Sequence, residues 1–495
     1  MDSYMLYRGS RGRQGPAGDG PRVGRPLQAR SRGGAWSRAG GGLGFAFVLA
    51  LQGITGSSAL SAQEIRESTP GETRRITLAE ARAEAAKHSP DVAAAHARAE
   101  AARQGARAAA SFLWPSLGAE AGAVRSDDPV AAFGGRLRQG RFTQADFDPG
   151  LLNNPDPLTD WSAAVGAEWT PVDLSADLGR RAAVKEAEAA GLVARWARRA
   201  AEFRAEVRYM EAVGAAARLR AARAAFEAAQ ANAEVARRRW EEGTLTRADV
   251  LQAQAMLEDA RTRVIDAERG VTDARETLSV ALGWPADLIP VPVDTLDLPT
   301  LAEAQGPARE VAAVDERPDL MASARGVEAA RTRAGQIRAA RLPKIGGFAR
   351  LSTHAADPFQ DTRRNWTVGF QVKLPVFTGF ALAARERAAS ALWTAAERDH
   401  EGRVRQARAQ ASGARRALEA ARQGAVAADA AAAAAEEAAR LMRRRFEEGL
   451  TTPADLLSAE ARAAQLRAAA VNSRLRVHIA RARLALLTGS SGEAN

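Results

Sequence analysis

Two stretches of the chain match: Arg237-Arg-Arg-Trp-Glu-Glu-Gly-Thr-Leu-Thr-Arg-Ala-Asp249-Val-Leu251 and, 206 residues later (443 − 237), Arg443-Arg-Arg-Phe-Glu-Glu-Gly-Leu-Thr-Thr-Pro-Ala-Asp455-Leu-Leu457. An earlier pair, Ser89-Pro-Asp-Val92 and Arg317-Pro-Asp-Leu320, is separated by 228 residues (318 − 90). Self-similarity at a long period indicates a duplicated architecture. The prolines Pro171 and Pro375 are 204 apart, so the first half carries about twenty-four extra residues (228 − 204) between Pro115 and Pro171.

The matching stretches predict helical hairpins with sharp tips. Gly243 and Gly449 stand where a helix needs a left-handed terminator. A threonine then caps the next helix, with a carboxylate three residues later. The two predicted caps are Thr246 with Asp249 and Thr452 with Asp455.

Each half reads in the same order: helix, strand, loop, strand, very long helix, tight turn, long helix. The first helix opens at the capping-box sequence Thr77-Leu-Ala-Glu80 and runs to about Ser111. The longest helices are on the order of 100 Å at ~1.5 Å per residue, which favours coiled-coil packing. The predicted hairpin helices are 175–242 with 246–282, and 381–448 with 452–487.

The strands alternate apolar and polar residues. Trp366-Thr-Val-Gly-Phe-Gln-Val-Lys-Leu374 and Trp161–Trp169 alternate clearly, Leu117–Val124 more weakly, and Ile345–Leu351 is ambiguous. Strands of this kind with aromatic ends are typical of a transmembrane barrel, although a small soluble sheet packed on helices alternates in the same way. An open sheet edge in lipid leaves backbone hydrogen-bonding groups unsatisfied at a high cost in free energy. Because one chain has only four such strands, we expect several subunits to combine their strands into one barrel.

The sequence therefore predicts a mostly α fold with a small antiparallel β part, arranged in four regions. These are a basic extension with a signal peptide (1–62), a first repeat (63–300), a second repeat (301–489) and a short tail (490–495). Within the repeats, strands are expected near 113–124, 161–171, 342–352 and 366–376, and hairpins at 175–283 and 379–488.

The first residues carry much of the net charge of +11: eight arginines oppose two aspartates in residues 1–62. An apolar core at Leu43–Leu51 follows, with small residues before Gln63, which is the layout of a cleaved secretory signal. Elsewhere the charges alternate in sign along helices, a pattern typical of solvated faces. Both observations argue against a nucleic-acid-binding protein.

The residues of common active sites do not come together in this sequence. There are no cysteines, and the five histidines show no ligand spacing. Neither a zinc-protease motif, a phosphate-binding loop nor a nucleophile elbow is present. We therefore expect no catalytic residues, no metal site and no cofactor.

Taken together, the repeated strand–helix order and the paired Glu-Gly-x-x-Thr-x-x-Asp-[Val/Leu]-Leu tips resemble the TolC-like outer-membrane efflux proteins. The helix ends at Leu282-Gly283 and Thr488-Gly489 fit as well, and Arg141–Asp156 looks like that family's first extracellular loop. The resemblance covers about residues 76–489.

The resemblance implies a homotrimer in the outer membrane with a long periplasmic tunnel and a twelve-stranded barrel, four strands from each chain. It also implies a periplasmic adaptor, an inner-membrane pump and contact with outer-membrane lipid, as in a tripartite efflux or type I secretion system. The expected function is a passive exit duct gated at its periplasmic tips.

The resemblance also assigns residues. A periplasmic gate is implied at Asp249, Asp455, Phe446, Thr451 and Ser458. Two of these depart from the family pattern, because Ser458 replaces a second acid and Thr451 replaces a basic latch residue. The adaptor-docking tips are Gly243, Thr244, Leu245, Gly449, Leu450 and Thr451, and the aromatic residues expected at the membrane interface are Trp114, Trp161, Trp169, Trp366 and Phe370.

Two other kinds of protein share some of these features. A soluble periplasmic coiled-coil adaptor or scaffold would have the hairpins but no lipid-facing strands. A basic helical nucleic-acid-binding protein would show salt-sensitive binding. The sequence does not identify the cargo.

Overall fold

The computed structural model describes residues 72–285, 287–295, 312–358 and 363–488. All of them belong to one compact unit, Ser58–Asn495. The predicted signal peptide, basic extension and tail at 490–495 lie outside the described residues. Among the described helices, none combines the length and hydropathy that a membrane-spanning helix needs.

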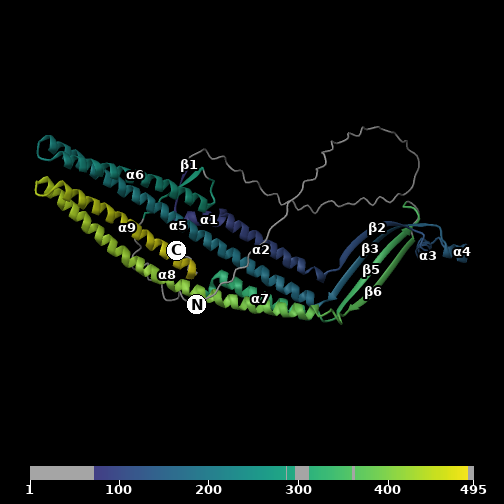
Figure 1. The fold of residues 1–495 in the computed structure, drawn as a ribbon. Coiled ribbons are helices and arrows are strands. Elements are labelled where there is room, and N and C mark those ends of the chain that lie inside the picture. The colour runs from purple at the N-terminus through teal and green to yellow at the C-terminus, as the bar shows by residue number, and fades with distance from the viewer. Residues whose placement is uncertain (1–71, 286, 296–311, 359–362, 489–495) are drawn as a thin grey trace, which may run out of the picture. The chain divides into compact units, whose positions relative to one another are not determined.

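Two helical hairpins dominate the fold (Figure 1). In the first, α5 (Leu174–Glu241, 68 residues) turns back into α6 (Arg247–Leu282, 36 residues). In the second, α8 (Ala381–Glu447, 67 residues) turns back into α9 (Pro453–Thr488, 36 residues). Most of the buried residues along α5 and α8 are alanines, which favour helix and let backbones approach closely. The hairpin helices thus lie within one residue of their predicted bounds.

The first predicted helix is interrupted, contrary to the expectation of one run from Thr77 to Ser111. The structure has α1 (Leu78–His88) and α2 (Pro90–Ala109), with Ser89 in an extended conformation between them. Proline has no N–H to continue the ladder and disfavours helical geometry at the residue before it. The second repeat has α7 (Pro318–Ala339), which begins at the equivalent proline.

A close backbone contact joins α6 to α1. Gly283 ends α6 with φ +73°, and a Cβ built there would lie 2.4 Å from the carbonyl oxygen of His88. Gly243 has nearly the same φ, +76°, but nothing lies within 4 Å of its Cβ position. A side chain at either glycine would therefore strain the backbone, but only a side chain at position 283 would also clash with a neighbour.

We expect Gly283→Ala to destabilise the protein more than Gly243→Ala. The left-handed backbone costs alanine about 1 kcal/mol at either position. The clash with His88 should add roughly 1–3 kcal/mol at position 283 alone. The midpoints of thermal unfolding of the two purified variants test this, and equal midpoints would contradict the structural assignment.

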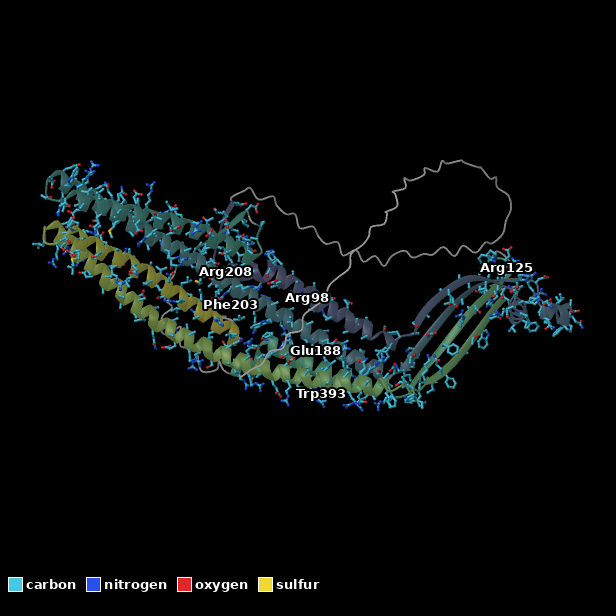
Figure 2. The ribbon with its side chains drawn as sticks, in the orientation of Figure 1. Arg98, Arg125, Glu188, Phe203, Arg208 and Trp393 are labelled. Carbon is cyan, nitrogen blue, oxygen red and sulfur yellow. The ribbon has the colours of Figure 1, made fainter. Side chains whose placement is uncertain are left out.

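One antiparallel sheet contains β2 (Ser116–Ser126), β3 (Leu158–Val172), β5 (Lys344–Ala355) and β6 (Arg363–Lys373), in that spatial order. Ser116 pairs with Glu168, Val172 with Ile345, and Lys344 with Lys373. The helical connections of all four strands therefore leave from one end of the sheet. Figure 2 shows Arg125 at the other end, away from labelled helical residues such as Glu188 and Trp393.

The extra residues of the first half lie between β2 and β3. Residues 127–157 connect these strands, whereas only 356–362 connect β5 to β6, a difference of twenty-four (31 − 7). The long connection folds into α3 (Pro129–Arg138), a 3-10 turn (Gln144–Phe147) and α4 (Pro149–Asn153).

Two further strands correct the expectation of only four. β1 (Glu72–Ile76) pairs in parallel with β4 (Leu288–Pro292), more than two hundred residues away. Tyr209 of α5 is fully buried beside this pair, and its hydroxyl lies 2.5 Å from Asp294 Oδ2 and 3.0 Å from the Ile76 carbonyl oxygen. Burial raises the pKa of the phenol, which stays protonated and can donate to the carboxylate.

Candidate functional site

The first hairpin tip is a closed turn between α5 and α6. Gly243 N–H donates to the Trp240 carbonyl (2.9 Å) and Thr244 N–H to the Arg239 carbonyl (2.8 Å), which is the Schellman pattern. Thr246 and Asp249 then form a capping box, with 2.7 Å between the threonine hydroxyl and the carboxylate. Hydrogen bonds from Thr246 lower the pKa of the Asp249 carboxyl.

The second tip repeats this turn with an extra hydroxyl. Gly449 has φ +76°, and Thr452 Oγ1 donates to Asp455 Oδ2 at 2.6 Å. Thr451 Oγ1 donates to the same oxygen at 3.2 Å. Hydrogen bonds from Thr452 and Thr451, with a smaller contribution from the Arg445 charge, lower the pKa of the Asp455 carboxyl. The side chain of Asp455 is exposed and ionised near neutral pH.

Three predicted gate residues make local contacts at this tip. Thr451 binds Asp455, and the Ser458 hydroxyl donates to the Asp455 carbonyl oxygen within its own helix at 2.9 Å. Phe446 is buried, with 5% of its surface exposed. Within one chain the structure therefore brings Thr451, Asp455 and Ser458 together, while Asp249 lies at the other tip.

The two tips differ in the leucine that each presents. Leu245 is half-buried against a small apolar cluster of Ala233, Ala236, Ala253 and Leu457. Leu450, its counterpart after Gly449, is 63% exposed. Of the predicted docking leucines, only Leu450 offers a large apolar surface to a partner.

Arg239 joins the tips and was not singled out from the sequence. Its guanidinium donates to the carbonyl oxygens of Phe446 (2.9 Å) and Glu447 (3.0 Å), the last residues of α8. The same group lies 4.4 Å from the centroid of the Phe446 ring. The sequence shows three consecutive arginines before each tip. This pattern does not indicate which of the three arginines contacts the other tip.

The sheet has one apolar face and one polar face. Val165 pairs with Leu351, which pairs with Trp366, so these residues share a face. This face exposes Leu117, Val165, Leu351, Trp366, Val368, Phe370 and Val372, each by half or more of its surface. The opposite face holds the ion pair of Glu120 with Arg350, together with Glu168 and Gln371.

The predicted interface aromatics occupy three levels of the sheet. Trp114, Trp169 and Phe370 lie toward the helical end, where Trp169 Nε1 donates to the Leu113 carbonyl oxygen at 3.2 Å. Trp161 lies toward the far end, opposite Ala355. Trp366 is the fourth residue of β6, but it is level with Val165, the midpoint of β3, because β6 begins lower than β3.

No cluster of three or more histidine, aspartate or glutamate side chains that could hold a metal ion occurs in the part of the chain that the structure describes. The lowered carboxyl pKa values at the tips come from capping hydrogen bonds. The chemistry available at these sites is therefore hydrogen bonding, charge and apolar contact.

The sequence matches the outer membrane efflux protein family over residues 81–284 and 311–490. The chain belongs to this family. Both matched segments include a hairpin tip and two strands of the sheet, so the family assignment covers the whole duplicated unit. It is a family of outer-membrane channel proteins.

Two relatives from other bacteria are similar to parts of this chain. The chain is 28% identical to the alkaline protease secretion protein AprF of Pseudomonas aeruginosa over 175 residues, which cover 34% of this chain and 36% of AprF. It is 30% identical to protein CyaE of Bordetella pertussis over 192 residues, 37% of this chain and 40% of CyaE. The chain thus matches well under half the length of each relative.

The fold agrees with a solved structure over a longer range. The outer membrane protein VceC of Vibrio cholerae superposes with a TM-score of 0.68 and 22% sequence identity, covering 83% of this chain and 96% of VceC. This agreement confirms the predicted fold class, a mostly helical chain with a small antiparallel sheet.

Proposed function

We propose that this efflux-family protein is the outer-membrane exit duct of a tripartite efflux or type I secretion system, a passive conduit with a long periplasmic portion. One observation carries the proposal: a four-stranded sheet with an exposed apolar face has two edge strands, each paired on one side only. Its outer strands β2 and β6 each have one neighbour in the described sheet. A sheet of this kind is stable in lipid only when other chains complete it.

The proposed assembly is a homotrimer. Three copies would pair β6 of one chain with β2 of the next and give twelve strands in a closed barrel. The apolar face, with Val368 at 66% and Phe370 at 83% exposure, would then contact outer-membrane lipid. The polar face would line the passage, where Glu120 and Arg350 are hydrated.

The hairpin tips are the proposed periplasmic gate and adaptor-docking surface. Arg239 holds one tip against the other, and the exposed Leu450 offers an apolar contact to a periplasmic adaptor, through which an inner-membrane pump would deliver cargo. The gate residues are Asp455, Thr451, Ser458 and Phe446 at one tip and Asp249 at the other.

Asp455 is expected to set cation block of the channel. In the proposed homotrimer, the three Asp455 carboxylates, one from each subunit, would surround the channel axis and attract cations. We expect Asp455→Ala to weaken block by a trivalent cation, added on the tip side of a planar bilayer, by about tenfold. Ser458→Asp, which adds a carboxylate one helical turn away, should strengthen the block; an unchanged block in Asp455→Ala would contradict the acidic ring.

Membrane fractionation tests the duct against the alternative, a soluble periplasmic scaffold. The duct predicts that the protein stays in the outer membrane after carbonate or urea extraction and conducts ions in planar bilayers. A scaffold would be washed off and would show no conductance. If carbonate or urea removes the protein from the membrane while its helical fold stays intact, the proposed duct is wrong.

A further inference from the structure

The connection between β2 and β3 forms a compact unit, which we call the lid and define as residues 127–157. Three aromatic rings pack edge to face inside it: Phe133 with Phe142 at 4.9 Å and Phe142 with Phe147 at 5.0 Å between centroids. Arg136 and Asp146 form an ion pair across it. The lid is therefore ordered by its own side chains, as in a compact Ω-loop.

Several contacts between the lid and sheet side chains lie on one face of the sheet. Successive strand residues point to opposite faces, so Leu158 and Asp160 lie opposite to Trp161. A Cβ on Gly135 would meet Leu158, and one on Gly140 would meet the Arg363 side chain at 2.9 Å. Asn365, adjacent to the outward Trp366, donates to the Arg138 carbonyl oxygen at 3.5 Å. These three sheet side chains, Leu158, Arg363 and Asn365, belong to the polar face.

Gln139 is the central contact between the lid and the sheet. Only 7% of its surface is exposed. Its Nε2 lies 2.9 Å from the Thr159 carbonyl oxygen, 2.9 Å from Asp160 Oδ1 and 3.2 Å from the Ala355 carbonyl oxygen. Asp160 is itself held by His354, with 2.8 Å between Oδ2 and Nδ1. One buried amide thus binds both β3 and β5.

We propose that the lid is a constriction inside the extracellular mouth of the channel, clasped to the inner wall by Gln139. The proposal rests on the proposed function, in which the polar face lines the passage. The lid follows Ser126, and Figure 1 shows its helices α3 and α4 at the end of the sheet away from the long helices. Its contacts with Leu158, Asp160 and Asn365 lie on the face opposite Trp161 and Trp366. Each subunit therefore places a folded segment in the exit, and the mouth is narrower than the strands alone would make it.

The test is polymer exclusion in planar bilayers, with the full-length protein in potassium chloride. Polyethylene glycol of graded mass is added to one side at a time, because a polymer that enters the mouth lowers the conductance. One variant replaces residues 127–157 with a copy of the natural connection 356–362. We expect this variant to admit larger polymers from the lid side than the unmodified protein, with unchanged exclusion from the tip side.

Gln139→Ala supplies a second, smaller change. Loss of the clasp should make excursions to a higher-conductance level about tenfold more frequent, because the buried amide binds both β3 and β5. Gln144→Ala is the matched control, since Gln144 is an exposed glutamine in the same lid. It should behave like the unmodified protein.

The outcomes separate the two proposals. Equal polymer access from the lid side in the unmodified and lid-replaced proteins overturns the constriction, even if the channel conducts. Absence of any conductance in the unmodified protein overturns the proposed duct instead. If Gln139→Ala does not fold, the lid-replaced variant still decides the question.

Discussion

Replacing Val368 with arginine is expected to remove the protein from the outer membrane. Val368 is 66% exposed on the apolar face, and it pairs with Ala349, which pairs with Ala167 close to the middle of β3. A guanidinium on the lipid side near the bilayer midplane costs about 2–4 kcal/mol. In a homotrimer three copies bear this cost together. The amount of urea-resistant protein in the outer-membrane fraction measures the effect.

Gln371→Arg is the matched control for Val368→Arg. Gln371 lies on the same strand but on the opposite, polar face, next to Gly346. An arginine there would be hydrated in the proposed passage, so we expect normal insertion. Equal loss of both variants from the membrane would mean that the sheet does not divide into a lipid face and a lumen face.

The hairpins were predictable because their signals are local. A glycine followed three residues later by a threonine cap fixes each tip within a few residues of sequence, and the structure places Gly243 and Gly449 at φ +76°. The strands also followed from local alternation. The break between α1 and α2 was missed although Pro90 indicates it. The helical pattern on both sides of Ser89 favoured the prediction of one continuous helix.

Long-range pairing set the limit of prediction from sequence. β4 is a five-residue strand with two prolines, and its partner β1 lies more than two hundred residues away, so neither has a recognisable alternation. The clasp at Gln139 joins a lid residue to strands from both repeats. Composition gives no reason to choose this glutamine over Gln144. Such contacts depend on how the two halves pack, which the repeat pattern alone does not determine.

Replacing Arg239 with alanine is expected to loosen the periplasmic end of the channel. The guanidinium supplies two hydrogen bonds to the last carbonyl groups of α8 and covers the Phe446 ring. Hydrogen bonds from a charged group contribute about 1.5–3 kcal/mol. A loss of about 2 kcal/mol corresponds to a roughly thirtyfold shift toward separated tips in each subunit. The opening frequency of single channels in planar bilayers measures this shift.

Arg445 provides the control, because it occupies the repeat-related position 206 residues later (445 − 239). Its carbonyl oxygen accepts from Leu450 N–H at 2.7 Å, just as the Arg239 carbonyl accepts from Thr244. The Arg445 side chain acts on Asp455 through its charge. Arg445→Ala removes the same charge without removing the bridge, so we expect few added openings. If both alanine variants open equally often, general loss of positive charge controls the gate, and the Arg239 bridge does not.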